Sequence, residues 1–401
     1  MKPSTDVPSP AADETKTLIG RVHYDIATIG EANWRACAEH ATYNPFVDYR
    51  FLHALEVSKS ACQETGWAPF HIALENEGDT VAVMPLYLKS HSRGEYIFDG
   101  SWANAWHQAG GRYYPKLQSS IPFTPATGPR LLAKPGSNQR EWQRQILAVA
   151  AQLVEQTKVS SLHITFLPEE EWELAGASGY LKRLDTQFHW YNNDYDDFEQ
   201  FQNELSSKKR KNIRRERREA MQDDIEVEWV TGSDLREHHW DAFYEFYMDT
   251  SYRKWGSSYL TREFFSLINE SMPEQTLLIL AKRAGRYIAG AINFIGDDTL
   301  FGRNWGCVEH HPFLHFEICY YQAIDYAIER KLRCVEAGAQ GSHKIARGYL
   351  ARETYSAHWL ANDSFKEAVA DFLRREQRYV KSDIEYVKAH SPFKSSLAPI
   401  R

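Results

Sequence analysis

Two clusters of polar side chains in the second half of the sequence could bind an anion and move a proton. The first is His315 and Glu317, at the start of a predicted helix that follows the predicted strand 303–306. Backbone N–H groups at a helix start favour negative charge. The second cluster lies in a glycine-containing loop after the next predicted strand. It consists of Glu336, Gln340, His343, Lys344 and Arg347.

The same residues have structural interpretations, which the sequence leaves open. Glu336 could be a structural carboxylate paired with Arg303 or Lys344. His315 could be a simple N-cap of its helix. The run 309–311 (Glu-His-His) offers metal-ligating types, but adjacent residues on one loop without distant partners rarely form a site. We therefore predict no metal site.

The segment 206–219 is strongly basic in a chain that is acidic overall. With Ser206 or Ser207 as N-cap, it predicts a helix with a continuous cationic face. The residues on that face are Lys208, Lys211, Arg215 and Arg218. Such a face suits the phosphates of tRNA, of a coenzyme or of a lipid-linked precursor. The alternative is a solvated helix in which nearby acidic side chains offset part of the charge.

The composition is that of a globular protein long enough for two domains. The 401 residues are 43% hydrophobic and 25% charged, and the net charge is -7 with a pI near 6.2. An acidic chain repels polyanions, so any nucleic-acid or membrane contact must be local. The five cysteines have no C-x-x-C spacing, which favours reduced thiols over a disulfide framework or a zinc ribbon.

The sequence shows no signal for export or membrane insertion. Residues 1–17 are rich in Pro, Ser, Asp and Glu and lack the apolar core of a secretory signal, so we expect a disordered tail. No apolar run approaches the roughly 20 residues that cross a bilayer. We therefore expect a cytoplasmic protein that is not an integral membrane protein.

An internal repeat indicates how the chain is organised. The regions from His71 and from Leu278 both predict strand, glycine turn, strand. In both copies a helical apolar stripe and a buried strand follow, at 146–154 and 162–167 in the first copy and at 316–328 and 333–338 in the second. The paired landmarks are Ile72 with Ile279, Gly78 with Gly285, Ala82 with Ala289, Phe98 with Phe301 and Trp102 with Trp305.

Antiparallel strands, then a helix, then a further strand is the order of a GNAT half. The repeat therefore predicts an α/β (α+β) fold of two tandem GNAT-type domains, each a mixed, mostly antiparallel sheet flanked by helices. The Asn/Asp-rich stretch 192–197 marks the junction. We predict domains at 18–190 and 191–391, with a tail at 392–401. Two unrelated α/β domains are the alternative.

Short motifs distributed over most of the chain carry a family resemblance. They are the basic run after Leu205, Asn44-Pro-Phe46, Tyr113-Tyr-Pro-Lys116, Pro122-Phe-Thr-Pro125, Lys254-Trp-Gly256, Leu314-His-Phe-Glu317, Glu336-Ala-Gly-Ala-Gln-Gly341 with His343-Lys344, and Tyr355-Ser-Ala-His-Trp359. Together they resemble the FemAB-like family, in the branch associated with peptidoglycan biosynthesis or recognition.

The resemblance implies an acyl- or aminoacyl-transferase. Characterised FemAB relatives move an aminoacyl group from aminoacyl-tRNA to an amine on a peptidoglycan precursor. We expect Glu336 or His315 to orient the amine or take its proton. The expected substrate-binding residues are Arg303, Trp305, Gln340, His343, Lys344 and Arg347. The donor is expected to be aminoacyl-tRNA or acyl-CoA, without a tightly bound cofactor, and the acceptor a small-molecule or peptide amine.

Two departures from the relatives leave the identity of the acyl donor undecided. The segment 303–308 matches the Arg/Gln-x-x-Gly-x-Gly/Ala loop for coenzyme A pyrophosphate only at its first glycine, and the coiled-coil arm of some FemAB members is absent from the sequence. One alternative function is a binding protein that recognises a peptidoglycan precursor, or another amino-containing ligand, without turnover. Another is a nucleic-acid-associated factor that uses residues 208–218.

Overall fold

The computed structural model describes residues 18–39, 42–255, 258–338 and 341–394. The strands are β1 (Leu18–His23), β2 (Trp67–Pro69), β3 (His71–Asn76), β4 (Asp79–Met84), β5 (Tyr87–Lys89), β6 (Lys116–Ser119), β7 (Leu132–Ala133), β8 (Ser161–Leu167), β9 (Leu181–Tyr191), β10 (Ile225–Thr231), β11 (Thr276–Arg283), β12 (Arg286–Ile295), β13 (Thr299–Cys307), β14 (Cys334–Glu336) and β15 (Leu350–Leu360). The predicted tail 1–17, and the predicted tail 392–401 from residue 395, lie outside the described residues.

The helices alternate with these strands along the chain. They are α1 (Glu31–Ala38), α2 (Tyr49–Val57), α3 (Gly100–Gln108), α4 (Gln139–Thr157), α5 (Glu169–Ala177), α6 (Phe198–Glu204), α7 (Ser207–Ala220), α8 (Glu237–Trp255), α9 (Arg262–Ser271), α10 (Leu314–Phe316), α11 (Gln322–Glu329) and α12 (Asp363–Ala389). A π-helical turn, Glu317–Tyr321, joins α10 to α11 and makes one bulged helix of the segment 314–329.

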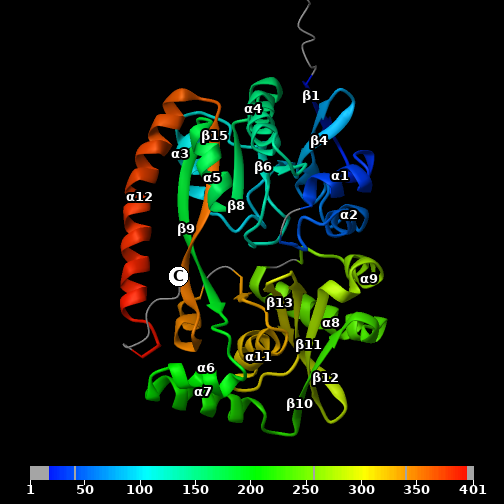
Figure 1. Cartoon of the computed structure of the whole chain (residues 1–401), viewed down its shortest axis with the longest axis vertical. Coiled ribbons are helices and arrows are strands. Elements are labelled where there is room, and N and C mark those ends of the chain that lie inside the picture. Colours follow the sequence, from blue (N-terminus) through cyan, green and yellow to red (C-terminus); the bar gives the residue numbers. More distant parts are fainter. Residues whose placement is uncertain (1–17, 40–41, 256–257, 339–340, 395–401) are drawn as a thin grey trace, which may run out of the picture.

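One large sheet runs through both halves of the molecule. Its strand order is β10-β11-β12-β13-β14-β9-β15-β8-β6-β5-β2. β9 comes from the first half of the sequence but pairs with β14 of the second, and β15 comes from the second half but pairs with β8 of the first. β9 and β15 also pair with each other, and Figure 1 shows β9 running from the upper half into the lower half. The two halves therefore exchange a strand.

The end of the chain returns to the first half. The long helix α12 packs on β9 and β15, and its Phe365, Val369 and Leu373 share a core with Trp102 of α3. In Figure 1, α12 lies along the outside of these strands. The predicted division into segments 18–190 and 191–391 stays a prediction. β15 and α12 belong to the second segment in sequence, but they pack against strands of the first segment.

The repeat predicted from sequence is present in its hairpins and helices. β3 and β4 form an antiparallel hairpin, as do β11 and β12, and the turn glycines Gly78 and Gly285 both have positive φ angles (+92° and +75°). The five apolar residues expected on one face of the first helix, Ile146, Leu147, Ala150, Leu153 and Val154, are the buried residues of α4. Each such side chain contributes about 1–3 kcal/mol on burial.

The predicted equivalence of Phe98 and Trp102 with β13 is wrong. Trp102 lies in the helix α3, and Phe98 is 62% exposed in a loop, whereas Phe301 and Trp305 lie in the strand β13. The reason is that charged side chains, rather than strand pairing, fix the segment 90–99. These charged side chains form a buried cluster with β6.

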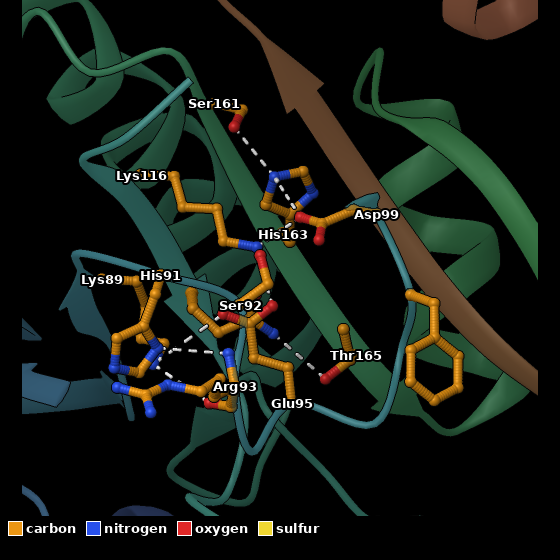
Figure 2. A network of polar contacts seen from close by, with 12 residues as sticks. Lys89, His91, Ser92, Arg93, Glu95, Asp99, Lys116, Ser161, His163 and Thr165 are labelled. Carbon is orange, nitrogen blue, oxygen red and sulfur yellow. Dashed lines mark hydrogen bonds and ion pairs between the residues drawn. The ribbon is translucent and has the colours of Figure 1, made fainter. Parts of the chain in front are cut away.

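That cluster, composed of Lys89, Glu95, Asp99 and Lys116, is shown in Figure 2. The Lys116 Nζ, from β6, donates to Glu95 at 2.7 Å and also to Asp99, and both lysines are fully buried. Burial lowers the pKa of Lys89 to about 7 and raises the pKa of Glu95 to about 7. Because Glu95 and Asp99 flank Tyr96, the cluster fixes the loop that carries Tyr96 towards the second half.

Candidate functional site

A pocket of about 450 Å³ lies where the two halves meet. Tyr96 and Pro125 of the first half form one side, and α8, β12, β13, the 314–329 helix and the loop after β14 form the rest. From the second half its lining consists of Tyr247, Thr250, Ser251, Ala291, Asn293, Gly302, Arg303, Asn304, Trp305, His315, Cys319, Tyr320, Ala337, Gly338, Gly341, His343 and Lys344. The pocket therefore brings together five residues predicted from sequence: Arg303, Trp305, His315, His343 and Lys344.

A β-bulge explains why neighbouring residues of β13 face the same pocket. Ala291 pairs with Trp305 and Asn293 with Gly302, so two steps along β12 match three steps along β13. The extra residue breaks the alternation of side chains at Arg303 and Asn304, and both reach the pocket. The Nη2 of Arg303 donates to the carbonyl oxygen of Phe123, which ties the bulge to the first half.

Four rings form one wall of the pocket. The ring of His315 lies 5.2 Å from that of Trp305 and 5.5 Å from that of Tyr320. The hydroxyl of Tyr320 and the Nε2 of His343 share a hydrogen bond of 2.8 Å. Burial and the neighbouring cations lower the pKa of His343, so this imidazole is neutral at neutral pH. The interpretation of His315 as an N-cap is wrong, because the cap position is Phe313.

Lys344 places a buried cation at the same wall. Its side chain is 2% exposed, and its Nζ donates to the carbonyl oxygen of Gly338 at 2.9 Å. Burial lowers the pKa of Lys344 to about 8, so the ammonium form still predominates at neutral pH. Charge in such a buried position interacts strongly with a substrate, because water does not screen it.

Arg347 supports this wall from behind. Its Nη1 donates to the carbonyl oxygen of His343 at 2.7 Å, and its Nη2 pairs with Glu216 at 2.9 Å. The guanidinium also stacks on Phe316, 3.4 Å from the ring centre. In this arrangement Arg347 holds the backbone that carries His343, and its direct contact with substrate stays a prediction. Gln340 lies outside the described residues.

Glu336 lies behind the pocket. Its carboxylate accepts from the backbone N–H of Thr127 at 3.4 Å and lies 3.9 Å from His189, whose pKa burial lowers to about 3. Burial raises the pKa of Glu336 to about 8, so the carboxyl is mostly protonated at neutral pH. Among the described lining residues are its neighbours Ala337 and Gly338 but not Glu336 itself. Its catalytic role stays a prediction.

The pocket also contains residues that sequence reasoning missed. Tyr96 is separated from β13 by about two hundred positions, and nothing in its local pattern indicates a site. Asn293 carried a signal, because it is a polar residue within the apolar strand pattern 288–295. Tyr320 was predicted only as part of the apolar stripe of its helix.

Comparison with known proteins places the chain in a family. The sequence profile of the FemAB-like family, described as peptidoglycan biosynthesis/recognition, matches residues 25–395. The chain belongs to the FemAB-like family. No protein with a curated description matches the sequence.

Solved structures with the same fold share little sequence with this FemAB-like chain. FemX is 12% identical, with a TM-score of 0.51 over 84% of this chain and 98% of FemX. The C-terminal domain of a putative lysylphosphatidylglycerol synthetase from Agrobacterium fabrum is 8% identical, with a TM-score of 0.53 over 87% of this chain and 96% of that domain. A tandem GNAT protein from the clavulanic acid pathway is 12% identical, with a TM-score of 0.45 over 86% and 99%. The fold shared with FemX and the synthetase domain is the predicted α/β architecture of two GNAT-type halves.

The basic helix of this FemAB-like protein is α7, and it begins at Ser207 without a side-chain cap from Ser206. One face packs inward, where Arg217 pairs with Glu317 at 2.9 Å and with Asp325 at 2.6 Å. The other face is exposed and has a hollow of about 330 Å³. The four predicted residues Lys208, Lys211, Arg215 and Arg218 are all exposed, and the last three line that hollow.

Within the described residues, no group of three or more His, Cys, Asp or Glu side chains could hold a metal ion. The helices of that same part of the chain include none that is long and apolar enough to cross a bilayer.

Proposed function

We propose that the protein transfers an acyl or aminoacyl group to an amine, in the pocket between its two halves. The observation that carries the proposal is the convergence of a neutral histidine, a buried ammonium and an arginine on one pocket of about 450 Å³. Transfer to an amine needs a proton acceptor and a positive charge near the carbonyl oxygen. Membership of the FemAB-like family and the fold shared with FemX support the same class of reaction.

In the proposed reaction, five residues of the pocket take part. His315 orients the amine, whose nitrogen attacks the carbonyl carbon while the π electrons move to the carbonyl oxygen. Lys344 and Arg303 stabilise the resulting oxyanion. The amine proton passes to the oxygen of Tyr320 as the hydroxyl proton passes to Nε2 of His343. Collapse of the intermediate breaks the bond to the donor oxygen or sulfur, which leaves as the alcohol or thiol by taking a proton back through Tyr320 from His343.

The relay predicts that Tyr320→Phe and His343→Ala each lower kcat by about 100-fold, because proton acceptance by a positioned group is worth at least that much. The double variant is expected to be no slower than the slower single variant, since the two groups act as one unit. Steady-state kinetics of the three variants measure this. Independent, multiplicative losses would contradict the relay.

The pH dependence of kcat/KM follows from two of the same groups. Activity is expected to rise as His343 loses its proton, at a pKa below the ordinary histidine value, and to fall as Lys344 loses its proton near pH 8. The profile of the wild type is therefore bell-shaped, with its maximum near neutral pH.

We propose that the exposed face of α7 binds the phosphates of the donor, and that the donor is either aminoacyl-tRNA or acyl-CoA. Lys208, Lys211 and Arg215 are exposed and available to a polyanion, and α7 packs directly on the 314–329 helix, which carries His315 and Tyr320. The acceptor is a small-molecule or peptide amine, for which a cell-wall precursor is the best-supported class in this family.

The triple variant Lys208→Glu, Lys211→Glu, Arg215→Glu is expected to bind the donor at least about tenfold more weakly at low salt, and to show a shallower salt dependence. Equilibrium titrations with aminoacyl-tRNA and with acyl-CoA, at two salt concentrations, measure both quantities. The matched control is the α12 variant Arg374→Glu, Arg378→Glu, Lys381→Glu, which reverses three exposed basic residues and changes the net charge by the same amount. If the α7 changes leave the donor affinity unaltered, the basic residues of α7 are merely solvated and do not bind the donor.

A second candidate function is recognition without turnover. The family description itself includes recognition, and the same pocket could bind an amino-containing ligand without transfer. Binding of an acceptor with no product from either donor would establish this alternative.

A further inference from the structure

Asn293 lines the pocket, and its buried side chain has no hydrogen-bond partner among the residues that the structure describes. Asn293 is 1% exposed, lies in the apolar strand β12 and lines the pocket. Neither its Oδ1 nor its Nδ2 has a hydrogen-bond partner among the residues that the structure describes. Leaving a buried polar group unpaired costs about 1–3 kcal/mol, so such groups require an explanation.

The residues that flank this amide are small. Gly302 is the pairing partner of Asn293 across the sheet, and a Cβ at position 302 would lie 3.3 Å from the Oδ1 of Asn293. The next residue on the same face of β12 is Ala291, which also lines the pocket and has a small side chain. Small residues therefore flank the amide on the pocket side, and its two polar atoms are themselves buried.

We propose that Asn293 binds an amide group of the substrate, with its Nδ2 donating to the ligand carbonyl oxygen and its Oδ1 accepting from the ligand N–H. This inference rests on the proposed function, because it assigns a substrate group to the transferase pocket. An amide presents an acceptor and a donor side by side, as the carboxamide of Asn293 does. A carboxylate offers only acceptors and an ammonium only donors, so either would leave one atom of Asn293 unpaired.

Two substrates of a transferase could supply this amide. One is the pantetheine arm of an acyl-CoA donor, and the other is the peptide of an acceptor. The probes are therefore pantetheine and the peptide N-acetyl-Lys-D-Ala-D-Ala, each with analogues in which one amide is replaced by an ester. An ester retains the carbonyl and loses the N–H, so it removes only the bond to Oδ1.

The test is equilibrium binding of these probes to the full chain and to Asn293→Leu. At least one probe should bind the wild type, with one ester analogue binding about tenfold more weakly. Asn293→Leu should bind the amide probe about tenfold more weakly and should no longer distinguish it from that ester. The probe that shows this coupling identifies the source of the amide.

Two controls separate binding from folding. Asn293→Leu should unfold at a temperature equal to or above that of the wild type, because it removes an unpartnered buried amide. Gly302→Ala keeps the carboxamide of Asn293 but places a methyl group against it, and should also weaken binding of the amide probe. An amide-to-ester difference that persists in Asn293→Leu would overturn the inference, as would failure of both probes to bind the wild type.

Binding and transfer fail separately in this design. If neither donor yields product but the amide probe binds in an Asn293-dependent way, the proposed function fails and the assignment of Asn293 stands. If product forms equally well with wild type and Asn293→Leu, the assignment of Asn293 fails alone.

Discussion

Lys344→Met should lower kcat/KM for transfer by about 1,000-fold at pH 7, the upper range for loss of one preorganised group that stabilises an oxyanion. The ammonium of Lys344 is buried at the pocket wall, where its Nζ donates to the carbonyl oxygen of Gly338 at 2.9 Å. Because it is buried, water screens its charge little, and no carboxylate among the described residues pairs with it. The methionine retains most of the apolar stem and removes the charge together with the hydrogen bond to Gly338. The measurement is kcat/KM across pH.

The pH profile separates this role from a structural one. In the wild type the alkaline limb lies near the Lys344 pKa of about 8, and the methionine variant should lose that limb while keeping the acid limb set by His343. Lys381→Met, on the exposed side of α12, is the matched control and should leave the profile unchanged. A Lys344→Met enzyme within threefold of the wild type would remove Lys344 from the mechanism.

Lys116→Met should destabilise the protein by about 3–5 kcal/mol, because it removes the buried cation that Glu95 and Asp99 share and leaves only Lys89, 3.9 Å from Glu95, in the cluster. Glu95 and Asp99 both accept from Lys116, and the three side chains are almost completely excluded from water. Denaturant unfolding at pH 7 measures the free energy. The same control, Lys381→Met, should change it by no more than about 0.5 kcal/mol.

A second variant tests the electrostatic origin of that loss. Asp99→Asn in the Lys116→Met background should recover part of the stability, since it removes the buried carboxylate whose lysine partner has been lost. Because the cluster fixes the loop that carries Tyr96, Lys116→Met should also weaken substrate binding. A loss of less than about 1 kcal/mol would show that the cluster does not hold the loop.

The sequence was sufficient for the local elements of the fold. Apolar residues at helical spacing predicted α4, and the continuous apolar run at 162–167 predicted β8, because period and burial are properties of neighbouring positions. The basic run predicted α7 to within a residue of its start. The same reasoning placed Arg303, Trp305, His315, His343 and Lys344 near one another, because strand ends and helix starts meet at one edge of a sheet.

The pairing of strands between the two halves and the buried charged cluster could not be predicted from the sequence. The exchange of β9 and β15 depends on which strands meet, and their apolar patterns are equally compatible with pairing inside their own halves. The expected equivalence of Phe98 and Trp102 with Phe301 and Trp305 failed because Glu95 and Asp99 are held by Lys116 rather than by strand pairing. Tyr96 reaches the pocket only as a result of that cluster.

The most direct test of the proposed transfer is detection of the amide product by mass spectrometry. Purified protein is incubated with aminoacyl-tRNA or acyl-CoA and a panel of amine acceptors, with Lys344→Met and His343→Ala in parallel and Lys381→Met as control. The structure predicts an acceptor heavier by the acyl or aminoacyl group with the wild type and with Lys381→Met, and its loss with both pocket variants. Product that forms equally with the pocket variants, or from neither donor with the wild type, would contradict transfer in this pocket.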